Sequence, residues 1–476
     1  MSATIISPER MTRLTGFGML SAGDGYLFRP ISVEDVQDVI RAASDAGFKI
    51  TQRGSGRSYG DANVGHETVI LDMTRMKRIL HWDRHTGVLE CEAGATIETL
   101  WRFAIEEGYW PPVVSGTMYP TLGGALAMNI HGKNNFCQGT LGEHVLEIEV
   151  VDAQGAVFNL TPKDELFYAV ISGAGLMGVV TKVKLQMKKI HSGDLKVFAR
   201  SIPNLEAQFE AFEQFEHEAD YMVSWIDCFP GGKQTGRGLF HAAWYADGPI
   251  STLRPEHQDL PDTVLGLLPK SVVWRALKIF STRFGMRSIN TAKFYASKYL
   301  GNEATHTQSL VAFSFLLDYV PNWRWAYKPC GFIQYQSFVP KEHAPLVFQK
   351  QLELQQAAEI ESYLGVMKRH RPDKFLLSHA VDGYSLALDF KVTEDTKQKV
   401  WDLAHRMNDI VLDAGGRFYL AKDSTLRPSD VKRYLGENAL RKFAKFRDEM
   451  DPNKIFTSSL AERTGLADPQ SLLANS

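Results

Sequence analysis

The sequence predicts an α+β protein with two or three hydrophobic cores, and three observations support this prediction. The chain has 476 residues, which is about three domain lengths by the usual range of domain sizes. Hydrophobic residues make up 44% and charged residues 23% of it, as in soluble globular proteins. Helical and strand-like segments alternate over residues 31–185, whereas longer strand-like runs separate amphipathic helices over residues 190–400. A disordered or fibrous chain is therefore excluded.

Helix signals are clear at three places in the first 190 residues. Ser32 can cap a helix that ends at Gly47, and a second helix is expected to open at Thr96 and end at Gly108. A third helix is expected to begin at Thr161, whose next residue is a proline. Branched residues predict strands at residues 48–51, 69–73, 88–91, 145–151 and 179–185.

The rest of the chain predicts a second, more antiparallel domain and a C-terminal segment. Strand-like runs occur at residues 221–229, 309–320, 331–339 and 385–392. From residue 401 onward we expect a helix, the segment 415–424, another helix and a polar tail that is frayed at its end.

Charge and cysteine content narrow the classes of function. The chain has 53 Lys and Arg against 55 Asp and Glu, so no net field attracts a polyphosphate backbone and nucleic acid is a poor first hypothesis. The four cysteines form no C-x-x-C pair for zinc or redox work. We therefore predict no metal site and a reducing compartment.

Targeting and membrane-spanning sequences are not expected. The first 20 residues lack a continuous apolar region and carry Glu9, Arg10 and Arg13, which does not fit a signal peptide. The apolar run at residues 310–320 is shorter than the roughly 18 residues that a spanning helix needs. The prediction is a cytoplasmic protein, soluble or peripheral at the inner face of a membrane.

Residues 173–178 match the dinucleotide-binding pattern G-x-G-x-x-G, but their context does not fit. The next residues, 179–185, alternate in a way that predicts a strand. No helix N-terminus would then receive a pyrophosphate, so we set this interpretation aside.

Two other small-residue segments are better candidates for binding phosphate and polar rings. The glycines of residues 53–60 let consecutive amides form a concave nest, with serine hydroxyls as further donors. A surface hairpin turn with solvated arginines is an equal alternative for this loop taken alone. Within residues 116–134, Gly123, Gly124 and Ala125 allow an extended ligand to lie against the backbone. Together these segments suit a long, bent cofactor.

At these residues the chain resembles the vanillyl-alcohol-oxidase (PCMH-type) family of FAD-binding oxidoreductases, most closely the members that act on polyprenylphosphoryl ribose. The matching strings are Arg13-Leu14-Thr15-Gly16-Phe17-Gly18, Arg57-Ser58-Tyr59-Gly60-Asp61, Gly123-Gly124-Ala125, His131-Gly132-Lys133-Asn134, Gln334-Tyr335-Gln336 and Ala421-Lys422-Asp423-Ser424. The resemblance implies a two-subdomain FAD-binding domain at residues 1–190 and an inserted antiparallel-sheet substrate domain at residues 191–400. Residues 401–476 would return to the FAD domain.

The resemblance also implies how FAD is held. Arg57 stands where many relatives carry the histidine that attaches the flavin covalently, so non-covalent FAD is expected, with His131 left open as another attachment point. The cofactor contacts that the resemblance implies are Arg53, Gly54, Ser55, Gly56, Arg57, Ser58, Tyr59, Gly60, Ala62, Gly116, Thr117, Thr121, Gly123, Gly124, Ala125, His131, Gly132, Lys133, Asn134, Val180 and Tyr419.

Oxidation of a secondary alcohol needs the carbinol hydrogen held against the flavin, an acceptor for the hydroxyl proton, and positive charge near the reduced ring. By its match to the family's catalytic lysine, Lys422 is the first candidate, followed by His131 and Tyr59. Expected substrate contacts are Lys133, Gln334, Gln336, Lys368, Ser385 and Lys422. For each side chain taken alone, a structural or solvent-facing role is the alternative.

The implied reaction is oxidation of a sugar's secondary hydroxyl to a ketone. The expected substrate is a polyprenylphosphoryl ribose, a cell wall arabinan precursor, and the group oxidised is its 2-hydroxyl. This oxidation would be the first half of an epimerisation that a separate short-chain reductase would complete. Members acting on that lipid-linked sugar carry a cysteine and an asparagine where this chain has Ala387 and Ser385, so the exact substrate stays open. The alternatives are a soluble alditol or aldonolactone oxidase that acts on free sugars, and a flavin-binding protein without catalysis.

Residues 270–287 are basic and amphipathic. A helix from Ser271 would place Val273, Leu277, Phe280 and Phe284 on one stripe, away from the basic side chains. This pattern fits a peripheral contact with anionic lipid, and a lipid-linked substrate would agree with that contact. The pattern taken alone favours an ordinary helix packed on the substrate domain.

Overall fold

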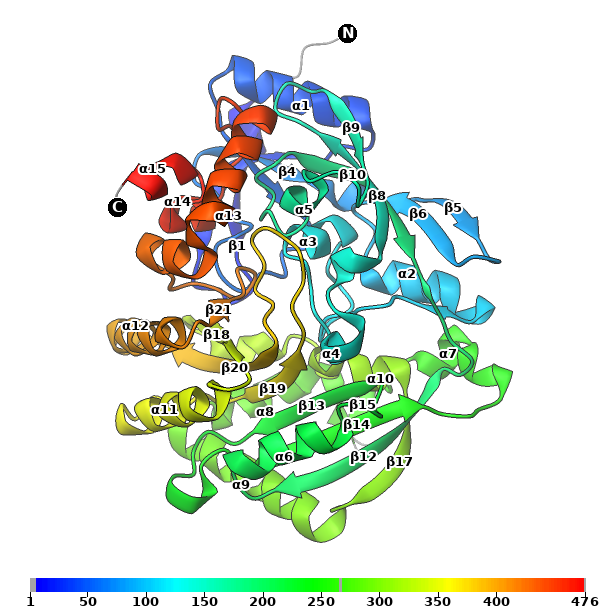
Figure 1. The fold of residues 1–476 in the computed structure, drawn as a ribbon, viewed down its shortest axis with the longest axis vertical. Coiled ribbons are helices and arrows are strands. Elements are labelled where there is room, and N and C mark those ends of the chain that lie inside the picture. Colours follow the sequence, from blue (N-terminus) through cyan, green and yellow to red (C-terminus); the bar gives the residue numbers. More distant parts are fainter. Residues whose placement is uncertain (1–5, 265–267, 475–476) are drawn as a thin grey trace.

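The computed structural model describes residues 6–264 and 268–474 and combines helices with several sheets (Figure 1). The N-terminal part holds two larger sheets. The first has the strand order β1 (Met11–Thr15), β2 (Ala22–Phe28), β4 (Thr68–Asp72) and β3 (Ile50–Arg53). The second has the order β5 (Ile79–Asp83), β6 (Val88–Glu92), β10 (Val179–Gln186), β8 (Val145–Val151) and β9 (Val157–Leu160). The strands predicted in this part are confirmed to within a few residues.

Two of the three predicted helices are confirmed with their caps. In α1 (Val33–Asp45) the Ser32 hydroxyl accepts a hydrogen bond from the amide of Asp35, and an apolar stripe is buried against the first sheet. In α2 (Ile97–Ala104) Thr96 caps the helix in the same way. A short turn of 3₁₀ helix then carries the chain to Gly108, whose φ of 75° ends it.

Two predictions of local structure are wrong. Thr161 does not open a helix, because its amide and hydroxyl both donate to the carboxylate of Asp164 and form a turn, and α5 begins only at Phe167 (Phe167–Val170). The apolar run at residues 309–320 is not a strand: Ser309 caps the short helix α10 (Leu310–Ser314). Short apolar runs fit a buried helix as well as a strand, so periodicity alone could not decide.

A single antiparallel sheet of eight strands dominates the middle of the chain. Its order is β17 (Ala304–Ser309), β12 (Asp194–Ile202), β14 (Gly238–Tyr245), β13 (Tyr221–Ile226), β19 (Gly365–His370), β20 (Gly383–Val392), β18 (Gly331–Pro340) and β21 (Arg417–Phe418). The strands expected near residues 221, 331 and 385 all belong to it. Its antiparallel character agrees with the prediction.

Alternation along these strands divides their side chains between two faces. One face packs on α6 (Leu205–Phe215), α11 (Ala344–Ala357) and α12 (Lys397–Asp413). Phe240 meets Phe212 of α6 at a ring distance of 5.0 Å, and Ser337 bonds to Gln351 of α11. Residues of the other parity, among them Gln334 and Gln336, face the cavity described below.

The C-terminal segment joins both parts of the molecule. After β21 it forms α13 (Pro428–Met450), α14 (Ser459–Thr464) and α15 (Pro469–Ala474), which lie beside the blue N-terminal strands in Figure 1. Arg463 donates to Asp61 at 2.9 Å and to Asp423 at 2.8 Å, and the amide of Ile50 donates to the carbonyl of Ile455. The domain limits at residues 190 and 400 stay a prediction.

The remaining elements are short or lie at the edge. They are β7 (Tyr109–Trp110) paired with β11 (Lys188–Lys189), β15 (Thr263–Val264) paired with β16 (Leu268–Pro269), α3 (Leu122–Ala127), α4 (Asn135–Gln138), α7 (Pro255–Gln258), α8 (Lys270–Phe280) and α9 (Arg283–Leu300). Within the described ranges, no helix has both the length and the apolar content needed to cross a membrane.

The predicted helix at residues 270–287 is divided. α8 ends at Phe280, and Thr282 caps α9 by accepting from the amide of Gly285. Val273 and Leu277 are half-buried, whereas Phe280 and Phe284 are exposed. The expected apolar stripe is therefore broken at Ser281 and does not form one continuous face.

Candidate active site

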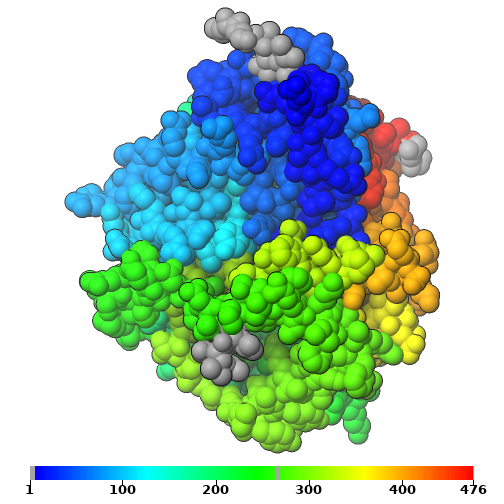
Figure 2. Space-filling view, turned by 180° about the vertical axis from the view of Figure 1, so that it is seen from behind, coloured from blue at the N-terminus to red at the C-terminus, as the bar shows by residue number. Residues whose placement is uncertain are grey.

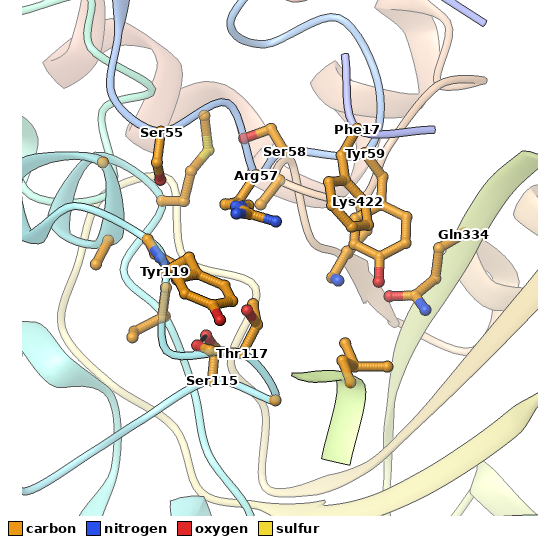
Figure 3. A pocket seen from close by; sticks show the side chains of 18 of the residues that line it. Phe17, Ser55, Arg57, Ser58, Tyr59, Ser115, Thr117, Tyr119, Gln334 and Lys422 are labelled. Atoms are coloured by element: carbon orange, nitrogen blue, oxygen red, sulfur yellow. Dashed lines mark hydrogen bonds between the residues drawn. The ribbon is translucent and has the colours of Figure 1, made fainter. Parts of the chain in front are cut away.

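A cavity of about 920 Å³ lies between the N-terminal loops and the eight-stranded sheet (Figure 3). This volume is near the upper end of the usual range for ligand sites. The predicted residues that line it are Arg53, Gly54, Ser55, Gly56, Arg57, Ser58, Tyr59, Ala62, Gly116, Thr117, Thr121, Gly123, Gly124, Ala125, His131, Lys133, Val180, Gln334, Gln336, Lys368, Tyr419 and Lys422. Sequence positions more than 350 residues apart thus share one cavity.

The N-terminal wall is built from loops with little side-chain bulk. A Cβ on Gly54 would lie 2.1 Å from Thr121 Oγ1, so the first loop can approach the start of α3 only without a side chain there. Thr121 in turn caps α3 by accepting from the amide of Gly124. This cradle of close backbone segments fits an extended dinucleotide cofactor such as FAD.

Arg53 serves the loop rather than the cavity. Its guanidinium donates to the side chain and the carbonyl of Asn63 and to the carbonyl of Thr15, which braces the turn. Gly56 has a φ of 67° and lies against this guanidinium. The charge of Arg53 is therefore largely committed to holding the loop.

Arg57 points toward the cavity (Figure 3). Its guanidinium carbon is 4.7 Å from the ring centre of Tyr119 and 5.5 Å from that of Phe17. Its buried Nε has no hydrogen-bond partner among the described residues, and burial lowers the pKa of the guanidinium. A buried donor without a partner is unusual in a finished structure, so a ligand acceptor fits beside it.

The loop at residues 173–178 also reaches the cavity, through Ala174, Gly175 and Gly178 among others. Gln52 Nε2 holds it by donating to the carbonyls of Gly175 and Gly178 at 2.7 and 2.8 Å. The strand β10 follows directly, which confirms that no helix opens here. The glycine pattern therefore lies at the cavity, but without a Rossmann helix.

The sheet wall carries functional side chains instead of backbone. The ladder between β18 and β20 pairs Gln334 with Asp389 and Gln336 with Ala387. The ladder between β19 and β20 pairs Lys368 with Ser385. These registers gather polar groups from three strands over one end of the cavity.

Lys422 stands at the meeting point of the two walls. Its Nζ lies 3.5 Å from the ring centre of Tyr59, and Figure 3 shows the amine turned into the cavity. Burial lowers the pKa of Lys422; the charge of Asp389 opposes this shift, and the charge of Lys368 adds to it. Lys422 is thus prepared to accept a proton near neutral pH, which a lysine in water is not.

Tyr59 and Asp389 complete this end of the cavity. Tyr59 is buried, its hydroxyl has no hydrogen-bond partner among the described residues, and burial raises its pKa. Asp389 is fully buried, accepts a hydrogen bond from Gln334 through Oδ1, and has no partner for Oδ2 within the described residues. Burial raises the pKa of Asp389, while the charge of Lys422 opposes that rise.

His131 belongs to a buried network in the wall. Its Nδ1 lies 3.0 Å from His379 Nε2, and its Nε2 lies 3.2 Å from the amide nitrogen of Gln336. Burial lowers the pKa of His131 well below its usual value and that of His379 to about 3, so both rings are neutral. Because both nitrogens of His131 are engaged, the ring is better placed to hold Gln336 than to exchange a proton with substrate.

Four predicted residues lie behind the cavity surface: Gly60, Gly132, Asn134 and Ser385. Gly60 packs so closely on the C-terminal segment that a Cβ would meet the Asp423 carbonyl at 1.9 Å. Asn134 donates to the carbonyl of Pro112, and Ser385 bonds to His370 and Gln336. These residues support the walls rather than line them.

Several lining residues were not predicted. Asp318 accepts from the hydroxyl of Thr117 and the amide of Met118, which ties the loop at residues 316–324 to the N-terminal wall. Lys293 of α9 and His241 of β14 line the sheet end of the cavity, and Asp389 lies in its wall. No local motif marks these positions, because each depends on a strand register or helix crossing formed only in the fold.

Comparison with known families gives two matches. The FAD binding domain family matches residues 25–161, and the D-arabinono-1,4-lactone oxidase family matches residues 330–464. The first match includes the loops of the N-terminal wall at residues 53–60 and 116–134. The second covers β18 through α14, including Gln334, Gln336 and Lys422.

Two of the relatives that match this chain do so over at least 90% of it. Decaprenylphosphoryl-beta-D-ribose oxidase of Mycolicibacterium smegmatis is 29% identical, over 96% of this chain and 98% of its own length. A putative D-arabinono-1,4-lactone oxidase of Neurospora crassa is 21% identical, over 90% of this chain and 81% of its own. L-gulono-1,4-lactone dehydrogenase of Mycobacterium tuberculosis is 28% identical but covers 40% of this chain and 45% of its own length.

Proposed function

The chain belongs to the PCMH-type FAD oxidoreductases, and we propose that it oxidises the 2-hydroxyl of a polyprenylphosphoryl-ribose-like substrate to a ketone. The observation that carries the proposal is the position of Lys422, whose amine faces the cavity between the glycine loops and the polar sheet wall. A separate reductase would then complete an epimerisation.

The N-terminal wall is the part that would hold FAD. The cradle formed by Gly54 with Thr121 and the loop at residues 173–178 would receive the extended cofactor, with the unpaired Nε of Arg57 as a further donor. When bound, FAD supplies the acceptor for the hydrogen that leaves the alcohol carbon as hydride. The residues of this wall contribute binding and orientation.

We propose that the FAD is held without a covalent bond. The histidines among the described cavity-lining residues are His131 and His241. Both ring nitrogens of His131 are already bonded, and His241 belongs to β14 in the sheet wall. Denaturing the protein with acid and centrifuging should leave the flavin in the supernatant; flavin that stays in the pellet would contradict this.

At the sheet wall, Lys422 is proposed to take the hydroxyl proton on Nζ as the C–H bond is broken. Its lowered pKa allows a neutral fraction that can accept this proton. The unpaired hydroxyl of Tyr59 faces the cavity beside it as a partner for the substrate hydroxyl. The charge of Asp389, buried behind the cavity surface, would stabilise the protonated amine. Gln334 and Gln336 would orient the sugar ring from the same wall.

Oxidation of a free aldonolactone is the second candidate, because the lactone oxidase family matches residues 330–464. The charge of the cavity favours a phosphorylated sugar instead. Lys368 faces the cavity with no carboxylate partner among the described residues. A neutral lactone leaves this cation uncompensated, whereas a phosphoryl group would neutralise it.

An exposed patch near the cavity would suit a lipid-linked substrate. Ile279 and Phe284 are 77% and 82% exposed, and Lys278 and Arg287 beside them are exposed as well. α8 packs on the 3₁₀ segment Trp323–Tyr327, with Trp274 and Trp325 at a ring distance of 5.3 Å. This segment begins at Trp323, which lines the cavity. In Figure 2 the yellow-green residues that contain the segment adjoin dark blue residues of the N-terminal part. We propose that the patch contacts anionic lipid.

The lipid contact is tested by sedimentation with anionic and neutral vesicles. Phe284→Ser should lower binding to anionic vesicles, whereas Leu346→Ser, at an exposed apolar position of α11, serves as the matched control. Equal binding by both variants would remove the proposal.

The reaction is tested by mixing the yellow protein with candidate substrates without oxygen. Polyprenylphosphoryl ribose should bleach the flavin, and mass spectrometry should find a product two hydrogens lighter than the substrate. Bleaching by aldonolactones or alditols, with none by the lipid-linked sugar, would favour the second candidate. No bleaching by any alcohol would indicate a flavin-binding protein without this activity.

A further inference from the structure

We propose that Lys293, Lys368 and His241 form a binding site for the phosphoryl group of the substrate. All three side chains line the sheet end of the cavity and come from α9, β19 and β14. The inference rests on the proposed function and adds the chemical group by which this cavity would select its substrate.

Strand register and helix packing bring the three groups together. In the ladder between β13 and β14, His241 pairs with Val223. In the ladder between β13 and β19, Ser224 pairs with Met367, so the next pair is Val223 with Lys368. His241, Val223 and Lys368 therefore lie in one row across three neighbouring strands. α9 packs across β12 and β14, which places Lys293 Nζ 4.1 Å from the ring centre of Trp225.

The charges at this end of the cavity are not balanced by the protein. Within residues 6–264 and 268–474, the side chains of Lys293 and Lys368 make no ion pair and no hydrogen bond. Buried arginines elsewhere are paired: Arg237 meets Asp227 at 2.8 Å, and Arg369 meets Asp382 at 2.7 Å. Lys368 is half-buried and Lys293 is exposed at the cavity surface, so an anionic ligand that fills this end of the cavity would pair with both amines.

Within the described residues, the carboxylates near the cavity form no ion pair with these two lysines. Asp318 is the one carboxylate among the described lining residues, and it accepts hydrogen bonds from Thr117 and Met118 on the N-terminal wall. Asp227, whose charge acts on Lys293, is bonded to Arg237 through both guanidinium contacts. Asp389 has an Oδ2 that is unpaired among the described residues, but it is fully buried in the wall and its charge acts on Lys422. None of the three carboxylates is paired with either lysine.

The protonation states suit a phosphoryl group near neutral pH. Burial lowers the pKa of Lys368 to about 8, so its amine is mainly charged at pH 7. Lys293, whose side chain is exposed, is charged at that pH as well. Burial lowers the pKa of His241 to about 4, and this neutral ring can donate one N–H. Lys133, also nearby, already donates to the carbonyls of Phe313 and Ser314.

The site also lies at a suitable place relative to the reacting hydroxyl. In a ribosyl phosphate the phosphoryl oxygen is on C1, next to the C2 hydroxyl. Lys368 is close enough to Lys422 for its charge to lower the pKa of that amine. A sugar whose 2-hydroxyl meets Lys422 would therefore carry its phosphoryl group toward Lys368 and, beyond it, His241 and Lys293.

The test is calorimetric titration of the FAD-loaded protein, in which the cofactor already occupies the glycine loops. The probes are a short-chain polyprenylphosphoryl ribose, β-D-ribose 1-phosphate and the neutral methyl β-D-ribofuranoside. The variants are Lys293→Met and Lys368→Met, with Lys298→Met as the matched control, because Lys298 is another exposed lysine of α9 but does not line the cavity. Flavin content reports whether each variant folds.

We expect each of the first two variants to raise the Kd of the lipid-linked probe at least tenfold and Lys298→Met to leave it unchanged. Equal weakening for ribose 1-phosphate would mean that a free sugar phosphate is recognised as well. The proposal is overturned if wild-type protein binds the charged and neutral probes equally, or if all three variants bind the charged probes alike. Phosphate-dependent binding without flavin bleaching would retain this site and reject the proposed reaction.

Discussion

The two walls of the cavity are built on different principles. The N-terminal wall presents mostly loop backbone and small residues, with Arg53 bonded to its own loop and Arg57 turned toward the cavity. The sheet wall presents lysine, glutamine and histidine side chains, and Lys368 among them has no carboxylate partner within the described residues. The difference suggests that the first wall binds a constant partner by shape, while the second binds and converts a variable one by side-chain chemistry.

The largest expected effect concerns Lys422 at the junction of the walls. Lys422→Ala should slow flavin reduction by the sugar about a thousandfold, because the proton acceptor and a nearby positive charge are both lost. The variant should stay yellow, because the glycine loops are untouched. Rapid mixing under anaerobic conditions measures this rate, and a wild-type rate would remove Lys422 from the reaction.

A substitution in the N-terminal wall should instead change how tightly FAD is bound. Gly54→Ala should weaken FAD binding at least tenfold, because the new Cβ would lie 2.1 Å from Thr121 Oγ1. Gly301→Ala is a matched control, since its nearest atom would be 4.0 Å away. Flavin content after purification distinguishes them. If both variants carry full FAD, the close approach of the loops is not needed for binding.

The pH dependence of binding should belong to the sheet wall alone. Lys368, with a folded pKa of about 8, is charged below that pH and neutral above it. Affinity for the phosphorylated sugar should therefore fall as pH rises through about 8, whereas affinity for the neutral riboside should not. Titrations at several pH values measure this, and equal profiles for the two ligands would contradict the assigned charge.

The smallest expected effect is a gain in stability. Without ligand, the charged amine of Lys368 is partly removed from water and has no carboxylate partner among the described residues. Because its pKa is lower in the folded than in the unfolded protein, this penalty is full well below pH 8 and disappears as pH rises toward 10.5. Lys368→Met should raise the free energy of unfolding at pH 7 by about 1–2 kcal/mol.

Thermal unfolding of the ligand-free protein at pH 7 and pH 10 measures this gain. Stabilisation that is equal at both pH values would mean that packing rather than charge is responsible.

The two walls also differ in how far the sequence could predict them. The N-terminal loops are contiguous in sequence, so their glycines and serines were recognisable as a binding cradle. Gln334 and Gln336 were found to share a face because strand alternation is a local property. Asp389 and His241 could not be found in this way, because strand pairing alone brings Asp389 beside Gln334 and His241 into one row with Lys368.

Local sequence patterns gave a wrong prediction where the same run of hydrophobic residues fits both a helix and a strand. Residues 310–314 form a helix although their apolar run reads equally as a strand. Thr161 was expected to cap a helix but closes a turn with Asp164. His131 was expected to be catalytic; whether it is remains a prediction, and its two bonded nitrogens now favour a positioning role.

The most direct test of the account is the bleaching rate of the bound flavin with polyprenylphosphoryl ribose that carries deuterium at C2. If the cavity holds that carbon against the flavin beside Lys422, the deuterated sugar should bleach the flavin several times more slowly than the ordinary sugar. The account would be contradicted by equal rates for the two sugars in a single turnover in which the chemical step limits the rate. It would also be contradicted if neither sugar bleached the flavin.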